Sequence, residues 1–141
     1  VVLQGSPNHN GSTAILVEEF IRGTRQAGHT AERIDIAEKN IAPCRGCVAC
    51  GYGARPCVQR DDMSEILEHI LHADMLVLAT PLYYYGMTAQ LKTVIDAFVQ
   101  RTVRLLLAGL KRRFSPLRGM TIVGHWRRWY RITKHSAAIS Q

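Results

Sequence analysis

Apolar residues recur with two different spacings in the first third of the chain. Residues 1–3 form a short apolar run that ends at Gly5, and residues 14–27 then repeat apolar side chains at helical spacing. The stretch that follows alternates as a strand does, with Ile34 and Ile36 on one face. A strand, a helix and a second strand of these lengths form a parallel unit with a right-handed crossover. The class is therefore α/β, and the loop after Gly5 is expected at the carboxyl edge of the sheet. The apolar face of the helix comprises Ile15, Leu16, Phe20, Ile21 and Ala27.

Further helices and strands follow as far as residue 123. Asp62 and Glu65 have the spacing of a capping box, which predicts that a helix begins there. Residues 73–79 are mostly apolar, as in a strand covered on both faces. A helix is expected from Thr88 to about Leu107. A fourth strand is expected over residues 120–123.

Length and charge limit the possible classes of protein. A chain of 141 residues suits one domain, and it contains no apolar run long enough to cross a bilayer. Nothing at its start resembles a signal peptide, so a cytoplasmic location is expected. The net charge is +7, yet all 11 acidic residues lie between Glu18 and Asp96. The excess of basic residues is therefore confined to the last segment, where interleaved Trp and Tyr residues raise nucleic-acid binding as a minor alternative.

The loop from Gly5 to Thr13 has the properties of a phosphate site. It connects a strand to a helix N-terminus, where backbone N–H groups and the helix dipole attract anions. The spacing matches neither a dinucleotide fingerprint nor a triphosphate loop, which favours a monophosphate such as that of FMN. An ordinary turn with Ser12 as helix cap is the alternative. The candidate phosphate donors are Ser6, Asn10, Ser12 and Thr13.

Four cysteines lie within a loop punctuated by Gly and Pro, and they are the strongest sign of metal chemistry. Two residues separate the first cysteine from the second and the second from the third, and six residues separate the third from the fourth. This spacing suits one tetrahedral ion or a cubane cluster. A four-iron cluster, a structural zinc ion and reduced thiols without metal all remain open from the spacing. The candidate metal ligands are Cys44, Cys47, Cys50 and Cys57.

Several motifs between Gly5 and Phe98 resemble those of the NADPH-dependent FMN reductase and iron–sulfur flavoprotein family. They are GSPNHNGST, PCRGCVACGYGARPC, RDDM and ADMLVLATPLYYYGMTAQLK. The resemblance implies a three-layer, flavodoxin-like parallel sheet in the order 2-1-3-4-5, with FMN at its carboxyl edge. It also implies that the loop after the third strand lines the flavin, although three consecutive tyrosines alone indicate surface packing more often. The residues of that loop are Pro81, Leu82, Tyr83, Tyr84, Tyr85, Gly86 and Met87.

The chain departs from the family pattern in two places. Asn8 occupies a position where the family often has Arg, which removes a cationic contact to the phosphate. Beyond Gly124 neither a further helix nor a fifth strand is found in the sequence. The expected organisation is thus a flavodoxin-like FMN-binding domain over residues 1–124, with a cysteine-rich loop at 43–57, and an atypical basic tail over residues 125–141.

The resemblance implies an NAD(P)H-dependent FMN oxidoreductase, with no evident catalytic residue beyond the flavin. With a 4Fe–4S cluster, the protein would pass electrons between flavin, cluster and a ferredoxin-type carrier. Without one, it would reduce flavin or a quinone. A zinc-containing binding protein with a nucleic-acid-binding tail is the alternative from another class. An exposed edge at the fourth strand favours a homo-oligomer, either a dimer or a tetramer.

Overall fold

The computed structural model describes residues 1–101 and 121–123. Its four parallel strands form one sheet in the order β2-β1-β3-β4. The predicted α/β class is confirmed, and the order matches the one expected for the first four strands. The expected fifth strand and the basic tail lie outside the described residues. The strands are β1 (Val2–Gln4), β2 (Arg33–Asp35), β3 (Val77–Ala79) and β4 (Thr121–Val123).

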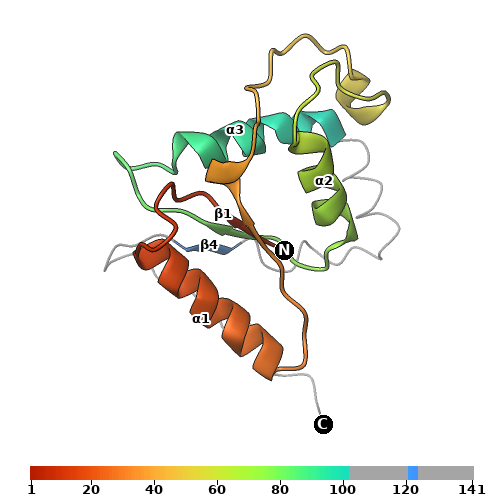
Figure 1. Ribbon diagram of the computed structural model, residues 1–141. Helices are drawn as coiled ribbons and strands as arrows, with labels where there is room; N and C mark the ends of the chain where they lie inside the picture. The colour runs from red at the N-terminus through yellow and green to blue at the C-terminus, as the bar shows by residue number, and fades with distance from the viewer. Residues whose placement is uncertain (102–120, 124–141) are drawn as a thin grey trace.

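Helices cover both faces of the sheet, which gives three layers (Figure 1). Helix α1 (Ser12–Gln26) lies on one face, and α2 (Met63–His72) and α3 (Ala89–Ala97) lie on the other. The 3-10 turns are η1 (Ile36–Glu38), η2 (Gly51–Gly53) and η3 (Phe98–Arg101). Within the described part of the chain, no helix is both long and apolar enough to cross a membrane.

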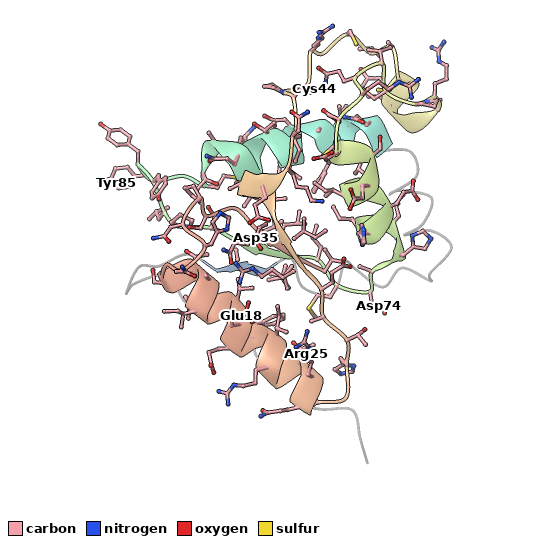
Figure 2. The ribbon with its side chains drawn as sticks, viewed as in Figure 1. Glu18, Arg25, Asp35, Cys44, Asp74 and Tyr85 are labelled. Carbon is pink, nitrogen blue, oxygen red and sulfur yellow. The ribbon has the colours of Figure 1, made fainter. Side chains whose placement is uncertain are left out.

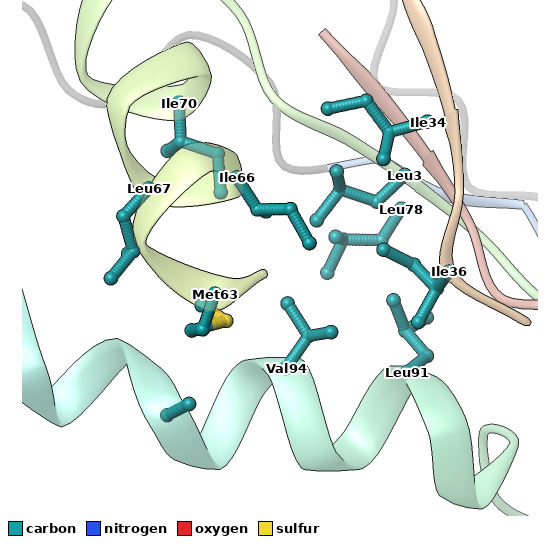
Figure 3. Close-up of a cluster of buried hydrophobic side chains, with 11 residues drawn as sticks. Leu3, Ile34, Ile36, Met63, Ile66, Leu67, Ile70, Leu78, Leu91 and Val94 are labelled. Atoms are coloured by element: carbon teal, nitrogen blue, oxygen red, sulfur yellow. The ribbon is translucent and has the colours of Figure 1, made fainter. Parts of the chain in front are cut away.

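The larger core lies between the sheet and the pair α2 and α3 (Figure 3). Leu3 and Leu78 face Ile66 of α2 and Leu91 and Val94 of α3, and all five side chains are fully buried. Truncating such a residue to Ala costs about 2–5 kcal/mol. This packing holds α3 firmly, so both ends of that helix have defined positions.

The smaller core, on the α1 face, differs from the sequence prediction. Val17 and Ile21 of α1 pack on Val2 and Val77 of the sheet. Of the predicted apolar positions, Ile15 is 61% exposed, and Leu16 and Phe20 are exposed as well. Of the apolar residues at helical spacing, Ile21 is therefore buried, whereas these three are not. The helix buries Thr13 and Ala14 instead, a polar and a small residue that a search for large apolar side chains overlooks.

The predicted capping box of α2 is also wrong, although the helix itself is confirmed. Asp62 is the N-cap residue, but its side chain makes no capping hydrogen bond. Its carboxylate accepts instead from the backbone N–H of Asn40 (2.8 Å). Asp61 accepts from the N–H of Met63 (3.2 Å) and from that of Ala42 (3.0 Å). Both carboxylates thus tie the cysteine-rich segment to the start of α2.

Two further boundaries differ from the predicted ones. The third strand comprises only Val77–Ala79. Ala73, the first residue of the predicted apolar run, is the C-cap of α2 instead. The helix predicted from Thr88 continues as an α-helix only to Ala97, and the chain then tightens into η3. The rest of the predicted helix, residues 102–107, lies outside the described residues.

Candidate functional site

Two loops meet at the carboxyl edge of the sheet. The glycine loop (residues 5–13) follows β1, and the tyrosine loop (residues 81–87) follows the neighbouring strand β3. The N–H of Gly5 donates to the carbonyl of Ala79 (2.7 Å), and the Thr88 hydroxyl donates to the carbonyl of Gly5 (2.7 Å). The expected proximity of the two loops is therefore observed, and hydrogen bonds on both sides of Gly5 fix it.

Hydrogen bonds within the glycine loop define its shape. The buried Ser6 hydroxyl accepts from the N–H of Asn8 (3.2 Å) and donates to its carbonyl (3.3 Å). The side-chain oxygen of Asn8 accepts from the N–H of Asn10 (3.1 Å). Asn8, which stands where the family often has Arg, therefore organises the loop. The Ser6 hydroxyl, one of the predicted phosphate donors, is already engaged inside it.

The first turn of α1 presents donors at this edge. Its N-cap residue is Gly11, which has an extended backbone conformation and no side chain that could cap the helix. The alternative in which Ser12 caps this helix is therefore wrong. The first N–H groups of a helix have no partner within the helix, and together with the helix dipole they attract anions. Ser12 is exposed and Thr13 is buried, so both hydroxyls lie beside these N–H groups at different depths.

Gly5 and Thr88 form a tight junction that the sequence analysis did not identify. A Cβ atom at Gly5 would lie 2.7 Å from Leu91 Cβ and 3.0 Å from Thr88 Oγ1, so only glycine allows β1 to approach α3 this closely. Thr88 is 1% exposed, and its hydroxyl also accepts from the N–H of Leu91 (3.3 Å) as the N-cap of α3. The sequence did offer a signal for the capping role of Thr88, because threonine is a preferred residue directly before a helix.

The tyrosine loop ends in a strained aromatic turn. Tyr83 and Gly86 exchange backbone hydrogen bonds of 2.9 and 3.0 Å, and the two residues between them are left-handed, with φ of 48° at Tyr84 and 66° at Tyr85. Left-handed backbone in non-glycine residues costs about 1–3 kcal/mol per residue. Tyr84 is 99% exposed and Tyr85 94% exposed, and Figure 2 shows Tyr85 at a tip that projects from the body of the molecule.

The aromatic rings of this turn are available for stacking. Their centroids lie 6.1 Å apart at an interplanar angle of 73°. Leu82 and Tyr83 are also exposed, whereas Met87 packs against the larger core. The loop thus offers apolar and aromatic faces beside the donors of α1, and strain of this kind is found where a ligand or partner uses the conformation.

A charged cluster borders the glycine loop at the end of β2. The Arg33 guanidinium donates to both carboxylate oxygens of Asp35 (2.8 and 2.9 Å) and to Glu18 of α1 (2.6 Å). The hydrogen bond to Asp35 raises the pKa of Arg33. His9 Nδ1 lies 3.7 Å from Asp35 and 3.6 Å from Glu38. These contacts attach β2 to α1 and to the glycine loop.

The cysteine loop (residues 43–57) arches out beyond α2 and α3 (Figures 1 and 2). All four cysteines line one cavity of about 160 Å³. Cys50 is buried, Cys47 is exposed, and Cys44 and Cys57 are half-buried. None of the four forms a disulfide. The predicted ligand residues are therefore gathered around one space.

The backbone of this loop donates to two of the sulfur atoms. Cys44 Sγ accepts from the N–H of Gly46, and Cys57 Sγ accepts from the N–H of Gln59, both at 3.5 Å. Hydrogen bonds to ligand sulfur are among the features that set the reduction potential of iron–sulfur clusters. Val48 and Tyr52 have positive φ angles of 56° and 55°, so the chain is tightly folded around the cavity.

The sulfur atoms do not converge on one point. In the described part of the chain, no three His, Cys, Asp or Glu residues are arranged to hold a single metal ion. A tetrahedral zinc site with Zn–S bonds of about 2.3 Å requires sulfur atoms roughly 3.8 Å apart. A four-iron cluster instead binds each thiolate to a different iron, which places the sulfur atoms around a larger body. The assignment of these cysteines as metal ligands stays a prediction.

The sheet order and the two loops at its carboxyl edge define a flavodoxin-like protein, with a candidate anion site beside an aromatic loop. The chain belongs to the NADPH-dependent FMN reductase family, whose model matches residues 1–132. The resemblance seen in the sequence motifs is thereby confirmed.

Curated proteins and solved structures are similar to this chain over about two thirds of its length or more. An iron–sulfur flavoprotein of Archaeoglobus fulgidus is 35% identical over 109 residues, which are 77% of this chain and 49% of the relative. One of Methanocaldococcus jannaschii is 37% identical over 94 residues, 67% of this chain and 48% of the relative. Among solved structures, an NAD(P)H:quinone oxidoreductase from Methanothermobacter marburgensis has a TM-score of 0.59 and 25% identity, over 69% of this chain and 50% of that chain. The chain spans about half the length of the curated relatives it matches.

Proposed function

We propose that this chain carries the flavin-binding part of an NAD(P)H-dependent oxidoreductase in which FMN exchanges electrons with a four-iron cluster held by the four cysteines. The observation that carries this proposal is the placement of two sites at the two ends of α3. Thr88, the N-cap of α3, holds the glycine loop, and η3, which follows α3, lines the cysteine cavity. A helix of nine residues is about 14 Å long. One well-packed helix therefore sets the separation of the two sites.

The carboxyl edge of the sheet fits FMN. In this proposal, the first-turn N–H groups of α1 and the hydroxyls of Ser12 and Thr13 donate to its phosphate, and the tyrosine loop provides aromatic faces to its ring. When bound, FMN accepts hydride from NAD(P)H and releases electrons singly or in pairs. Because Asn8 replaces the frequent Arg, phosphate binding here depends on N–H groups and hydroxyls.

The cysteine loop fits a cluster better than it fits a single ion. All four thiols line one cavity, two of them accept backbone N–H groups, and they do not meet at a point as zinc ligands do. A cluster also requires reduced thiols, which supports the cytoplasm as the compartment in which this protein acts. A ferredoxin-type carrier is the partner we propose for electrons that leave the cluster.

We further propose that the protein is a homo-oligomer. Tyr84 and Tyr85 are almost fully exposed, and Ile15 and Phe20 add apolar surface on α1. Exposed aromatic residues of this kind are enriched where proteins associate. Sedimentation analysis tests this point: a species of two or four chains supports it, and a monomer at micromolar concentration contradicts it.

The first test is an absorption spectrum of protein purified without oxygen, with flavin, iron and zinc quantified on the same sample. Flavin bands with about four irons per chain support the whole proposal. Flavin without iron contradicts the cluster and leaves a simple flavin or quinone reductase. A protein that binds zinc and stays colourless after addition of FMN contradicts both parts.

Two variants separate the two sites in that test. Cys57→Ser removes a cluster ligand and is expected to lose iron while it retains FMN. Ser12→Ala removes a phosphate donor and is expected to weaken FMN binding about three- to tenfold, with iron unchanged. Riboflavin, which lacks the phosphate, provides the control: its affinity should be the same for Ser12→Ala and the unmodified protein. Equal losses of FMN and riboflavin affinity contradict the placement of the phosphate.

A further inference from the structure

Gln100 is a buried polar residue at the cysteine cavity that the assignments above do not use. It lies in η3, directly after α3, and is 5% exposed. It lines the same cavity as the four cysteines, together with the neighbouring Val99. Its backbone is held by α3, whose Val94 and Ala97 are fully buried, and by contact between η3 and η2 of the cysteine loop. Gln100 is therefore held at the cavity that the four cysteines line.

The side-chain nitrogen of Gln100 lacks an acceptor. Nε2 is buried, and no atom of the described structure accepts a hydrogen bond from it. Buried donors without a partner are rare in folded proteins, and each requires an explanation. A ligand of the cavity that provides an acceptor is one such explanation.

Four cysteines line the cavity, so sulfur is the most frequent side-chain acceptor there. No carboxylate lines it, and its remaining side chains come from Arg45, Val48, Tyr52, Gln59 and Val99. Gln59 donates from Nε2 to the carbonyl of Pro43 (3.3 Å), so its Oε1 and the Tyr52 hydroxyl are the other side-chain acceptors of the lining. Neither accepts from Gln100 Nε2 in the described structure. A bound cluster would add further sulfur acceptors to the same cavity.

We propose that Gln100 donates from Nε2 to a sulfur of the cluster and thereby raises its reduction potential. This inference rests on the proposed function, since it requires a cluster in the cavity. The reduced cluster carries one more negative charge than the oxidised one, so a hydrogen bond to sulfur stabilises the reduced form more. Gln100 is thus a tuning residue, supplied by the 3-10 turn η3 that directly follows α3.

The test compares Gln100→Met with the unmodified protein. Met is an unbranched side chain of similar size without a donor. We expect four irons per chain to be retained and the midpoint potential of the cluster to fall. The fall in potential is read from the ratio of reduced to oxidised cluster at a fixed applied potential. For a one-electron couple, a tenfold change in that ratio corresponds to about 59 mV. Gln90→Met, at an exposed position of α3, makes the same chemical change away from the cavity and should leave the potential unchanged.

A second measurement keeps the inference testable if Gln100→Met loses its iron. Pulsed EPR of the reduced, unmodified protein labelled with 15N at glutamine side chains should detect a nitrogen coupled to the cluster. A coupling that is present in the unmodified protein and in Gln59→Met, which removes the other glutamine amide at the cavity, supports the inference, and its absence overturns it. An unchanged potential in iron-loaded Gln100→Met also overturns the inference but leaves the cluster intact. Unmodified protein without iron instead contradicts the proposed function itself.

Discussion

Asn40 and Asp62 exchange two hydrogen bonds at the base of the cysteine loop. The N–H of Asp62 donates to the carbonyl of Asn40 (3.0 Å), and the N–H of Asn40 donates to the carboxylate of Asp62 (2.8 Å). The N–H of Ala42 donates to Asp61 next to them (3.0 Å). The segment that enters the loop is thereby joined to the segment that leaves it. A loop with four cysteines is thus held at its base by backbone groups and two carboxylates.

Replacing Asp62 by Ala should loosen this base. The N–H of Asn40 loses its acceptor, and we expect the free energy of unfolding to fall by about 1 kcal/mol. The cysteine loop should also become more sensitive to proteolysis. Asp62→Asn is the matched control, because it retains a side-chain oxygen that can accept from Asn40. Urea denaturation and limited proteolysis measure both effects, and equal behaviour of the two variants would count against this role of the carboxylate.

Replacing Thr88 by Val should destabilise the protein and weaken FMN binding together. Val has the same shape but leaves the buried carbonyl of Gly5 without its donor and the N–H of Leu91 without its cap. The expected cost is about 2–4 kcal/mol in the free energy of unfolding. Thr88→Ser retains the hydroxyl and serves as the control. Denaturation and flavin titration of both variants test this prediction, and a stable Thr88→Val protein with normal FMN affinity contradicts it.

Replacing Tyr84 and Tyr85 by Asn and Gly should have opposite effects on stability and on flavin binding. Asn and Gly accept the left-handed conformations of a two-residue turn, so the apoprotein should gain about 1–2 kcal/mol in stability. Loss of the aromatic faces should weaken FMN binding by about tenfold or more. Thermal unfolding and flavin fluorescence titration measure the two effects. Unchanged FMN affinity would exclude these rings from the flavin site.

The four thiols should be alkylated at different rates before iron is added, and all four should be protected from alkylation afterwards. In the iron-free protein, exposed Cys47 should react with iodoacetamide well before Cys50, which is 7% exposed. After reconstitution with iron and sulfide, all four should be protected, because each thiolate binds an iron. Peptide mass spectrometry at successive times gives the order. Continued alkylation of any one cysteine after reconstitution would remove it from the ligand set.

Much of the fold could be predicted because its elements depend on local patterns. The apolar run of residues 1–3 and the burial of Ile34 follow from the side-chain pattern of a strand. Ile36, expected on the same strand, is also buried, but it begins the 3-10 turn η1. The buried face of α1 shows the limit of this approach. Ile15 and Phe20 are apolar but exposed, because the orientation of the helix on the sheet, and not the apolar character of each side chain, decides which face is buried.

The candidate site was predictable only in part, for the same physical reason. The glycine loop, the tyrosine loop and the cysteines are each continuous stretches of chain, so their composition identifies them. The sequence did not reveal residues whose hydrogen-bond partners lie far away along the chain. Thr88 reaches Gly5 across the parallel crossover, and Asp62 reaches Asn40 across the cysteine loop.

The sequence by itself therefore determined the α/β class and the three candidate loops, because periodicity, glycine placement and cysteine spacing are local properties of the chain. The family followed from its motifs, and the order of the first strands followed from the resemblance to that family. Only the tertiary structure decided what surrounds those loops. It placed Gln100 beside the four cysteines, made Gly5 necessary for contact with α3, and held Tyr84 and Tyr85 in left-handed conformations. These features depend on how the strands and helices pack, and packing joins residues that no local pattern connects.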